Sequence, residues 1–159
     1  MFFQKKRKII EDVKACFDGE IIALEDVNDP MFAKKILGDG IAIQPTNHTL
    51  YAPVSGKVSA IFDTKHAIGF TLNNGAEILI HIGLDTVELE GEGFQLQVSV
   101  GDQVGAGDVI GKVDFESIKA RGKEIITPIL LTKTKQYLIQ YKKTEGKVHA
   151  GDVLYQIVS

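Results

Sequence analysis

Short apolar runs separated by glycine-containing turns constrain the fold of this chain more than any other feature of its sequence. Sixteen glycines are spread over 159 residues, and the runs between them are rich in β-branched and aromatic side chains. Frequent turns between short strands are typical of an all-β sandwich or barrel. The runs that we predict as strands include 20–24, 41–44, 56–62, 68–72, 78–82, 94–100 and 137–140.

Helical patterns are few and brief. Asp29 and Pro30 precede an apolar segment at 31–36, which places an N-cap residue and a proline at the start of a helix. A second segment, 115–121, ends at Gly122. We therefore expect a few short helical turns within the all-β fold.

One turn pattern occurs twice. The sequence Val-x-Ala-Gly-Asp-Val is found at 104–109 and again at 148–153, each time leading into an apolar run. Two copies of one unit predict a duplicated sheet motif packed around a common core. With 44% hydrophobic and 25% charged residues, the composition is ordinary for a single globular domain, which we assign to 16–159. A short basic tail over 1–15, containing Lys5, Lys6, Arg7 and Lys8, is expected to be mobile.

Charge, cysteine content and the length of the apolar runs argue against several classes of protein. A net charge of −3 does not suit nucleic-acid binding. The single cysteine, Cys16, cannot form an intramolecular disulfide and fits the reducing cytoplasm. No run approaches the roughly 20 apolar residues that cross a bilayer, so membrane contact would be peripheral. We expect a cytoplasmic protein that binds other proteins or small molecules.

Two histidines are predicted to meet on one face of a hairpin. Asn74 and Gly75 between apolar runs are a strong signal for a two-residue turn. That loop would place His81 opposite Ile68, with His66 diagonal to His81 on the same face. The same count assigns Thr64, Phe70, Leu79 and Gly83 to the histidine face, and Ala67, Thr71, Ile78 and Ile80 to the other. A shift of one residue would separate the histidines.

Paired imidazoles suit either phosphoryl transfer or metal binding. A neutral imidazole presents one unprotonated nitrogen as a nucleophile, a second can donate a hydrogen bond to phosphate oxygens, and a hydroxyl such as Thr64 can fix its tautomer. Zinc is the chemical alternative, but a catalytic zinc site has about three protein ligands, and the third would have to be Asp29 or Asp85. His48, in a polar loop, and His149, in the repeated turn, are expected at the surface.

Four segments resemble, in the same order, those of the glucose-type IIA family of the bacterial sugar phosphotransferase system. They are 37–43, 52–58, 62–67 and 81–94, and the similarity extends from about Cys16 to the C-terminus. The resemblance implies a small β-sandwich with a duplicated hybrid motif. It also implies a phosphocarrier, a component of a protein-histidine phosphotransferase. Such a carrier takes a phosphoryl group from HPr and passes it to a cysteine of a IIB domain for sugar uptake and phosphorylation.

The resemblance also assigns roles to individual residues. His81 matches the phosphorylated histidine, which reacts through Nε2, His66 matches the second active-site histidine, and Thr64 matches its hydroxyl partner. The face that both partner proteins use would comprise Asp29, Met31, Phe32, Phe62, Leu79, Asp85 and Val87. Its apolar members would form the docking surface, and its carboxylates would meet basic residues of the partners. Neither a cofactor nor a metal is implied.

Other functions occur on the same architecture. A zinc hydrolase of the lysostaphin-like class would use a His-x-His pair, which the sequence lacks. A biotinyl or lipoyl carrier would present a lysine at the hairpin tip, where this chain has Asn74 and Gly75. Regulation of other proteins through the same face, according to its phosphorylation state, is implied by the resemblance alone.

Overall fold

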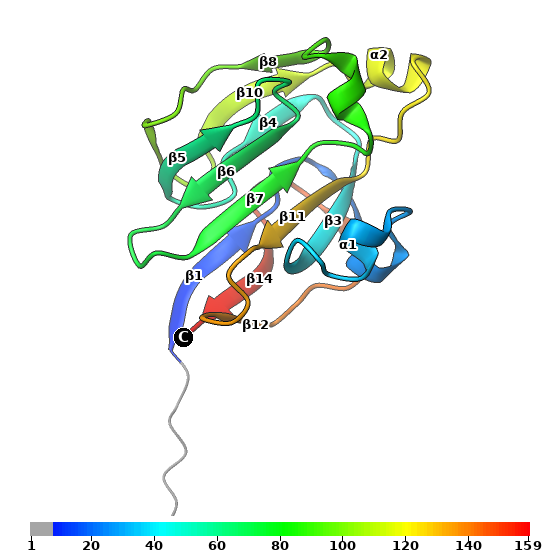
Figure 1. Ribbon diagram of the computed structural model, residues 1–159. Helices are drawn as coiled ribbons and strands as arrows, with labels where there is room; N and C mark the ends of the chain where they lie inside the picture. The colour runs from blue at the N-terminus through cyan, green and yellow to red at the C-terminus, as the bar shows by residue number, and fades with distance from the viewer. Residues whose placement is uncertain (1–7) are drawn as a thin grey trace, which may run out of the picture.

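A computed structural model describes residues 8–159 and shows a body of packed antiparallel sheets (Figure 1). The strands are β1 (Ile9–Lys14), β2 (Gly19–Ala23), β3 (Asp39–Pro45), β4 (Thr49–Tyr51), β5 (Gly56–Ile61), β6 (Ala67–Thr71), β7 (Glu77–His81), β8 (Phe94–Leu96), β9 (Gln103–Val104), β10 (Val109–Val113), β11 (Thr127–Leu131), β12 (Leu138–Gln140), β13 (Lys147–Val148) and β14 (Val153–Val158). The helical elements in this range are α1 (Pro30–Ala33), α2 (Phe115–Ala120) and the 3₁₀ helices η1 (Leu24–Asp26) and η2 (Thr86–Leu89). The predicted all-β sandwich with a few short helical turns is confirmed.

Three sheets enclose the main hydrophobic core. The largest has the strand order β13-β2-β3-β11-β7-β6-β5-β9, and the two smaller ones are β1-β14-β12 and β4-β10-β8. All three contribute side chains to one cluster, in which Tyr155, Phe17 and Phe70 are the largest fully buried residues. Burying a large apolar side chain stabilises a fold by about 1.5–3 kcal/mol, so this cluster is the main source of stability.

Strands β3 and β11 are buried on both faces. In β3, Ile41 and Ile43 face the main core, whereas Ala42 faces a second, smaller cluster. All five residues of β11 are buried. The second cluster consists of Leu24, Val27, Phe32, Ala42, Leu84 and Leu130. Because η1 and α1 cover this outer face, residues 128–131 of β11 are all apolar, and α1, which lies beside β3 (Figure 1), is fixed near the end of β7 by the contact of Phe32 with His81.

The repeated sequence pattern forms the same turn twice, between β9 and β10 and between β13 and β14. The carboxylates of Asp108 and Asp152 each accept a backbone N–H from three residues earlier, at 2.7 and 2.8 Å. Gly107 and Gly151 have φ angles of 91° and 94°, which side-chain-bearing residues rarely adopt. The duplicated motif expected from the sequence is therefore present.

Two predicted elements are shorter than expected. The helix predicted at 31–36 ends at Ala33, because Lys35 has a left-handed φ of 57°. The strand predicted at 94–100 ends at Leu96, because its pairing with β10 covers only Phe94–Leu96. Their starting points are as predicted.

Part of the predicted N-terminal tail is a strand. Residues Ile9–Lys14 form β1, which pairs with β14 and places Val13 opposite Tyr155. Tertiary pairing with the last strand of the chain thus orders a segment whose own composition suggests a tail. Lys5, Lys6 and Arg7 lie outside the described residues, and the division of the chain at residue 16 stays a prediction. Across 8–159, no helix has the length and apolar character needed to span a membrane.

Candidate active site

The hairpin formed by β6 and β7 has a register one residue away from the predicted one. A two-residue loop would place His81 opposite Ile68, whereas the structure pairs His81 with Ala67. The loop is longer because the N–H of Leu72 donates to the carbonyl of Ala76 at 2.9 Å and encloses three residues. The Asn-Gly signal located the turn correctly but not its length.

This shift changes which side chains share the outer face of the hairpin. Leu79 lies on the same face as His81, as predicted. The prediction is wrong for Phe70, which is fully buried in the main core. It is also wrong for Ala67 and Thr71, which lie on the face of His81.

The two histidine rings meet in spite of the shift. Their centroids are 4.9 Å apart and their planes are inclined at 78°. His66 precedes the first residue of β6, so the alternation of strand side chains does not set its direction. It follows a tight turn in which Lys65 has a φ of 60° and donates its N–H to the carbonyl of Phe62 at 2.7 Å. The predicted proximity is present, but a turn produces it rather than the strand register.

Each ring has one nitrogen in a short hydrogen bond. The Nδ1–H of His81 donates to the backbone carbonyl of Gly83 at 2.8 Å. Because a carbonyl only accepts, the proton of the neutral ring lies on Nδ1, and Nε2 keeps a free lone pair. Nδ1 of His66 lies 2.6 Å from Oγ1 of Thr64. A hydroxyl donates and accepts, so this contact is compatible with either tautomer of His66.

Burial keeps both imidazoles uncharged at neutral pH. His66 is only 3% exposed, and its burial, followed by the neighbouring His81, lowers its pKa to about 4. Burial also lowers the pKa of His81, against the opposing effects of the Gly83 carbonyl and the carboxylates of Asp29 and Asp85. Two neutral rings can therefore lie side by side without charge repulsion.

Two phenylalanine rings frame the histidine pair. The ring centroid of Phe32, on α1, is 5.0 Å from that of His81, and the ring of Phe62 stands edge-on to His66 at 5.4 Å. Phe32 is 2% exposed and belongs to the second cluster, so it supports His81 from below the surface. Phe62 is 47% exposed and is available for contact with another molecule.

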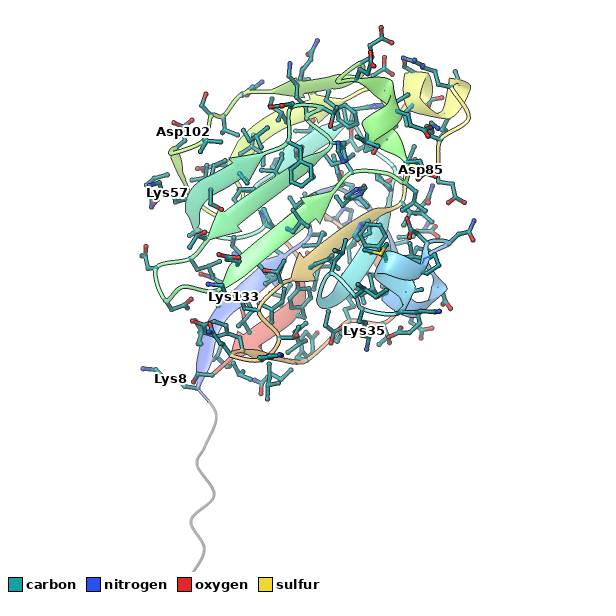
Figure 2. All side chains as sticks on the ribbon, in the orientation of Figure 1. Lys8, Lys35, Lys57, Asp85, Asp102 and Lys133 are labelled. Carbon is teal, nitrogen blue, oxygen red and sulfur yellow. The ribbon has the colours of Figure 1, made fainter. Side chains whose placement is uncertain are left out.

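The other residues predicted for the partner face are placed as follows. Met31 and Val87 are exposed apolar side chains, and Leu79 is half-buried against the second cluster. The carboxylate of Asp29 caps α1 by accepting the N–H of Met31 at 2.9 Å. Asp85 is exposed directly before η2, on the same side of the molecule as α1 (Figure 2). Exposed apolar groups and two carboxylates thus lie at α1 and η2, and α1 contacts His81 through Phe32.

Sequence reasoning missed three contributors to this region. The sequence predicts Gly83 on the histidine face but not its role as the hydrogen-bond acceptor of His81; its position two residues after the histidine is the available signal. Ile36 and Leu37 are 58% and 38% exposed, and their N–H groups approach the carbonyl of Met31. An apolar pair after a helix and outside any strand is a signal for such a surface.

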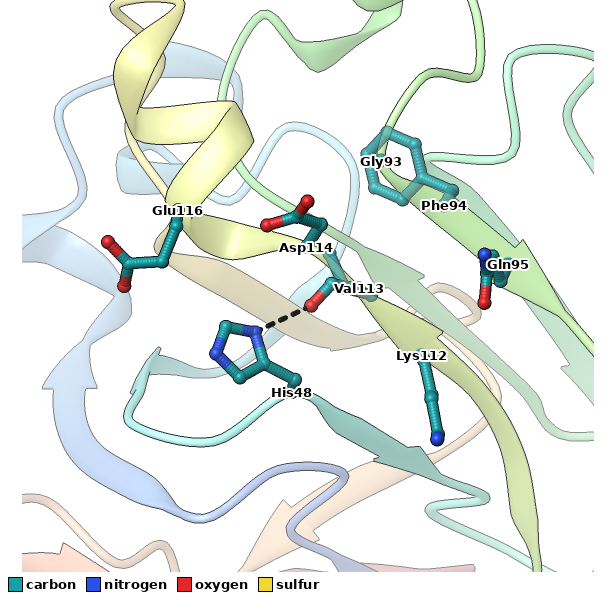
Figure 3. A pocket seen from close by; sticks show the side chains of 8 residues that line it. All are labelled: His48, Gly93, Phe94, Gln95, Lys112, Val113, Asp114 and Glu116. Carbon is teal, nitrogen blue, oxygen red and sulfur yellow. Dashed lines mark hydrogen bonds between the residues drawn. The ribbon is translucent and has the colours of Figure 1, made fainter.

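The remaining histidines lie on other elements. His48 precedes β4, and its Nδ1–H donates to the carbonyl of Val113 at 2.8 Å in a pocket that also holds Lys112 and Glu116 (Figure 3). His149 lies in the second copy of the repeated turn, and both histidines are exposed, as predicted. Over residues 8–159, no three His, Cys, Asp or Glu side chains are grouped so as to hold a metal ion.

Known proteins resemble this chain over most of its length. A family model described as phosphoenolpyruvate-dependent sugar phosphotransferase system, EIIA 1, matches residues 11–137. The glucose-specific EIIA component of Staphylococcus aureus (strain COL) is 44% identical over 136 residues, which are 84% of this chain and 82% of that protein. The solved structure of glucose permease IIA from Mycoplasma capricolum matches with a TM-score of 0.87 and 42% identity, over 99% of each chain.

A further relative is much longer than this chain. The beta-glucoside-specific EIIBCA component of Bacillus subtilis (strain 168) is 46% identical over 144 residues, which are 91% of this chain and 24% of that protein. Nothing in these comparisons supports a zinc hydrolase. Sequence, fold and relatives agree that the chain belongs to the EIIA 1 family of the phosphoenolpyruvate-dependent sugar phosphotransferase system and is a phosphocarrier of that system.

Proposed function

We propose that His81 carries the phosphoryl group on Nε2 and accepts it from phospho-HPr. The observation that supports this assignment is the 2.8 Å hydrogen bond from Nδ1–H of His81 to the Gly83 carbonyl, which leaves the lone pair of Nε2 free. Because burial lowers the pKa of His81, the nucleophile is a neutral imidazole at pH 7. In the transfer, Nε2 forms a bond to phosphorus while the bond from phosphorus to the donor histidine breaks.

His66 and Thr64 serve the phosphorylated state in this proposal. The ring of His66 is close enough to that of His81, at 4.9 Å between centroids, for its Nε2–H to donate to a phosphate oxygen. That role requires the proton of His66 on Nε2, so the Thr64 hydroxyl would donate to Nδ1 across the 2.6 Å contact. Hydrogen bonds to ionised acceptors are about twice as strong as neutral ones, so the interaction favours phospho-His81 over the free ring.

The second half-reaction delivers the phosphoryl group to a cysteine of a IIB domain. The thiolate attacks phosphorus, the bond to Nε2 breaks, and His81 regains its lone pair. The exposed side chains of Met31, Phe62 and Val87 would dock both partners, because an apolar surface accommodates different shapes. Asp29 would join Asp85 in attracting basic residues. Placement in the cytoplasm, with contact to a membrane permease through IIB, follows from family membership.

Incubation with phosphoenolpyruvate, Enzyme I and HPr tests the assignment of His81. Intact mass and acid lability are measured for the wild type, His81→Ala and the control His48→Ala, whose histidine has a similar Nδ1 hydrogen bond at 2.8 Å. We expect one acid-labile phosphoryl group on the wild type and on His48→Ala, and none on His81→Ala. Circular dichroism confirms that both variants are folded.

Two outcomes would contradict the proposal. Phosphorylation of folded His81→Ala to the wild-type level would assign the phosphoryl group to another residue. If the wild-type protein gains no mass although HPr is phosphorylated in the same reaction, then HPr is not its phosphoryl donor.

A further inference from the structure

The turn after β7 contains a polar residue that is completely buried. Thr86 has 0% exposure, and its hydroxyl donates to the carbonyl of Ile82 at 2.5 Å. A buried hydroxyl without a partner is costly, so this hydrogen bond is the stable arrangement of the side chain. The Ile82 carbonyl belongs to the peptide plane that leads into Gly83. Thr86 therefore fixes the plane on one side of the residue that binds His81.

The peptide plane that follows Gly83 is also held in place by a hydrogen bond. The N–H of Leu84 donates to the carbonyl of Glu124 at 3.0 Å. In a trans peptide, the carbonyl and N–H of one plane point in opposite directions. This hydrogen bond therefore directs the Gly83 carbonyl away from Glu124, and that carbonyl accepts Nδ1–H of His81.

Gly83 fits between these two contacts because it lacks a side chain. A Cβ at this position would lie 2.6 Å from the methyl carbon of Thr86 and 2.8 Å from the carbonyl oxygen of Glu124. Its φ of 75° is a conformation that glycine adopts readily. The methyl of Thr86 thus lies against Gly83, and the hydroxyl is the group that holds the preceding carbonyl.

We propose that Thr86 is a positioning residue for phosphoryl transfer. It touches neither the phosphoryl group nor the reacting nitrogen. By holding the peptide plane before Gly83, while the Leu84 hydrogen bond holds the plane after it, Thr86 helps to fix the backbone at Gly83. The Gly83 carbonyl then stays on Nδ1 of His81, which keeps the proton on Nδ1 and the Nε2 lone pair free. The kinetic consequence rests on the proposed function of His81, whereas the tautomer of His81 is a property of the unphosphorylated protein.

Nitrogen NMR of histidine-labelled protein at pH 7.5 measures this tautomer directly. The wild type and Thr86→Ser, which keeps the hydroxyl, should show His81 with Nδ1 protonated. Thr86→Val, which keeps the size but loses the donor, should show a mixture of both tautomers. Acceptance from phospho-HPr should then slow by about two- to tenfold in Thr86→Val, the equivalent of one hydrogen bond, and recover in Thr86→Ser.

The same set of Thr86 variants can also contradict the proposal. A folded Thr86→Val protein with the wild-type tautomer would overturn the proposal, as would a Thr86→Ser protein that resembles Thr86→Val. If Thr86→Val does not fold, Thr86→Cys replaces it, because a thiol of similar size is a weak donor and should give an intermediate tautomer ratio. A wild type that shows the expected tautomer but accepts no phosphoryl group would refute the function of His81 and leave the positioning of its ring intact.

Discussion

His81 and His48 are held in the same way but have different surroundings. Each donates Nδ1–H to a backbone carbonyl at 2.8 Å, and each packs beside a phenylalanine ring. The centroid distances are 5.0 Å from His81 to Phe32 and 5.9 Å from His48 to Phe115. In the neutral form of either ring, the proton therefore lies on Nδ1 and Nε2 keeps a free lone pair.

The two histidines differ in the surroundings of Nε2. His81 is half-buried and faces the ring of His66, whereas His48 is exposed and lines a pocket with Lys112 and Glu116 (Figure 3). A fixed tautomer thus occurs at a site with no assigned role as well as at the candidate active site. A second imidazole and a desolvated setting are the features that distinguish His81.

Replacing the phenylalanine that packs against each histidine should have the largest effect in both regions. Phe32 and Phe115 are each 2% exposed, so alanine at either position should lower the free energy of unfolding by about 3–5 kcal/mol in urea titrations. Phe32→Ala should also slow phosphoryl acceptance by His81, because its ring contacts that imidazole. Phe115→Ala serves as the matched control. Equal losses of acceptance in the two variants would show that destabilisation alone, rather than contact with His81, causes the effect.

Acidification should affect the two histidine sites differently, because one is buried and the other is exposed. His66 has a pKa of about 4 in the folded protein, against 6.5 ordinarily, so between these values the unfolded chain binds a proton that the folded one does not. Linkage then requires stability to fall with falling pH across this window, by about 3 kcal/mol between pH 7 and pH 4.

Urea titrations at pH 7, 5.5 and 4 check this expectation. His66→Gln should lose less stability on acidification than the wild type, because glutamine does not titrate. His48→Gln, at the exposed histidine, is the matched control. Parallel curves for His66→Gln and the wild type would show that His66 is not the group responsible.

Loss of the second imidazole should separate the two half-reactions. In His66→Ala, we expect acceptance from phospho-HPr to persist, while transfer to IIB slows by about a hundredfold, the cost of losing one positioned donor. Rapid-quench measurements of each step resolve the two rates, and His48→Ala should change neither. Blocked acceptance, or two unaffected steps, would contradict this role of His66.

The smallest expected effect concerns the carboxylates near His81. Asp85→Asn should weaken association with HPr by about threefold at low salt, because an exposed charge mainly affects the encounter with a basic partner. Glu116→Gln, beside His48, is the matched control and should have no effect. Kinetics at two salt concentrations check the prediction, which fails if the effect of Asp85→Asn is as large at high salt.

The strands that alternate between core and solvent were predictable from the sequence, and those governed by distant contacts were not. Ile78 and Ile80 identify one face of β7 by their spacing, and both are buried. The strand β11 has no alternation, because η1 and α1 cover its second face. The strand β1 follows a basic segment and is ordered by pairing with β14. Neither the elements that cover β11 nor the strand that pairs with β1 can be predicted from the local sequence pattern.

The candidate site shows the same division. The turn at Asn74 and Gly75 was located from two residues, but its length, and hence the register, depends on a backbone hydrogen bond. His66 and His81 were paired from that register, while the structure brings them together through a turn. The sequence offers no signal for Thr86, because its hydrogen bond to Ile82 and its position against Gly83 arise from the turn after β7, which no periodicity encodes.

The two hydrophobic clusters play different parts in the molecule. Over residues 8–159, the main cluster holds the sheets together, whereas the second consists of six buried residues contributed by α1, η1 and the strands and turns under them. Substitutions in the second cluster that change side-chain shape would shift α1, and with it Met31 and the Phe32 ring that packs on His81, while leaving the main cluster in place. A few interior changes would therefore alter both the docking surface and the support of His81.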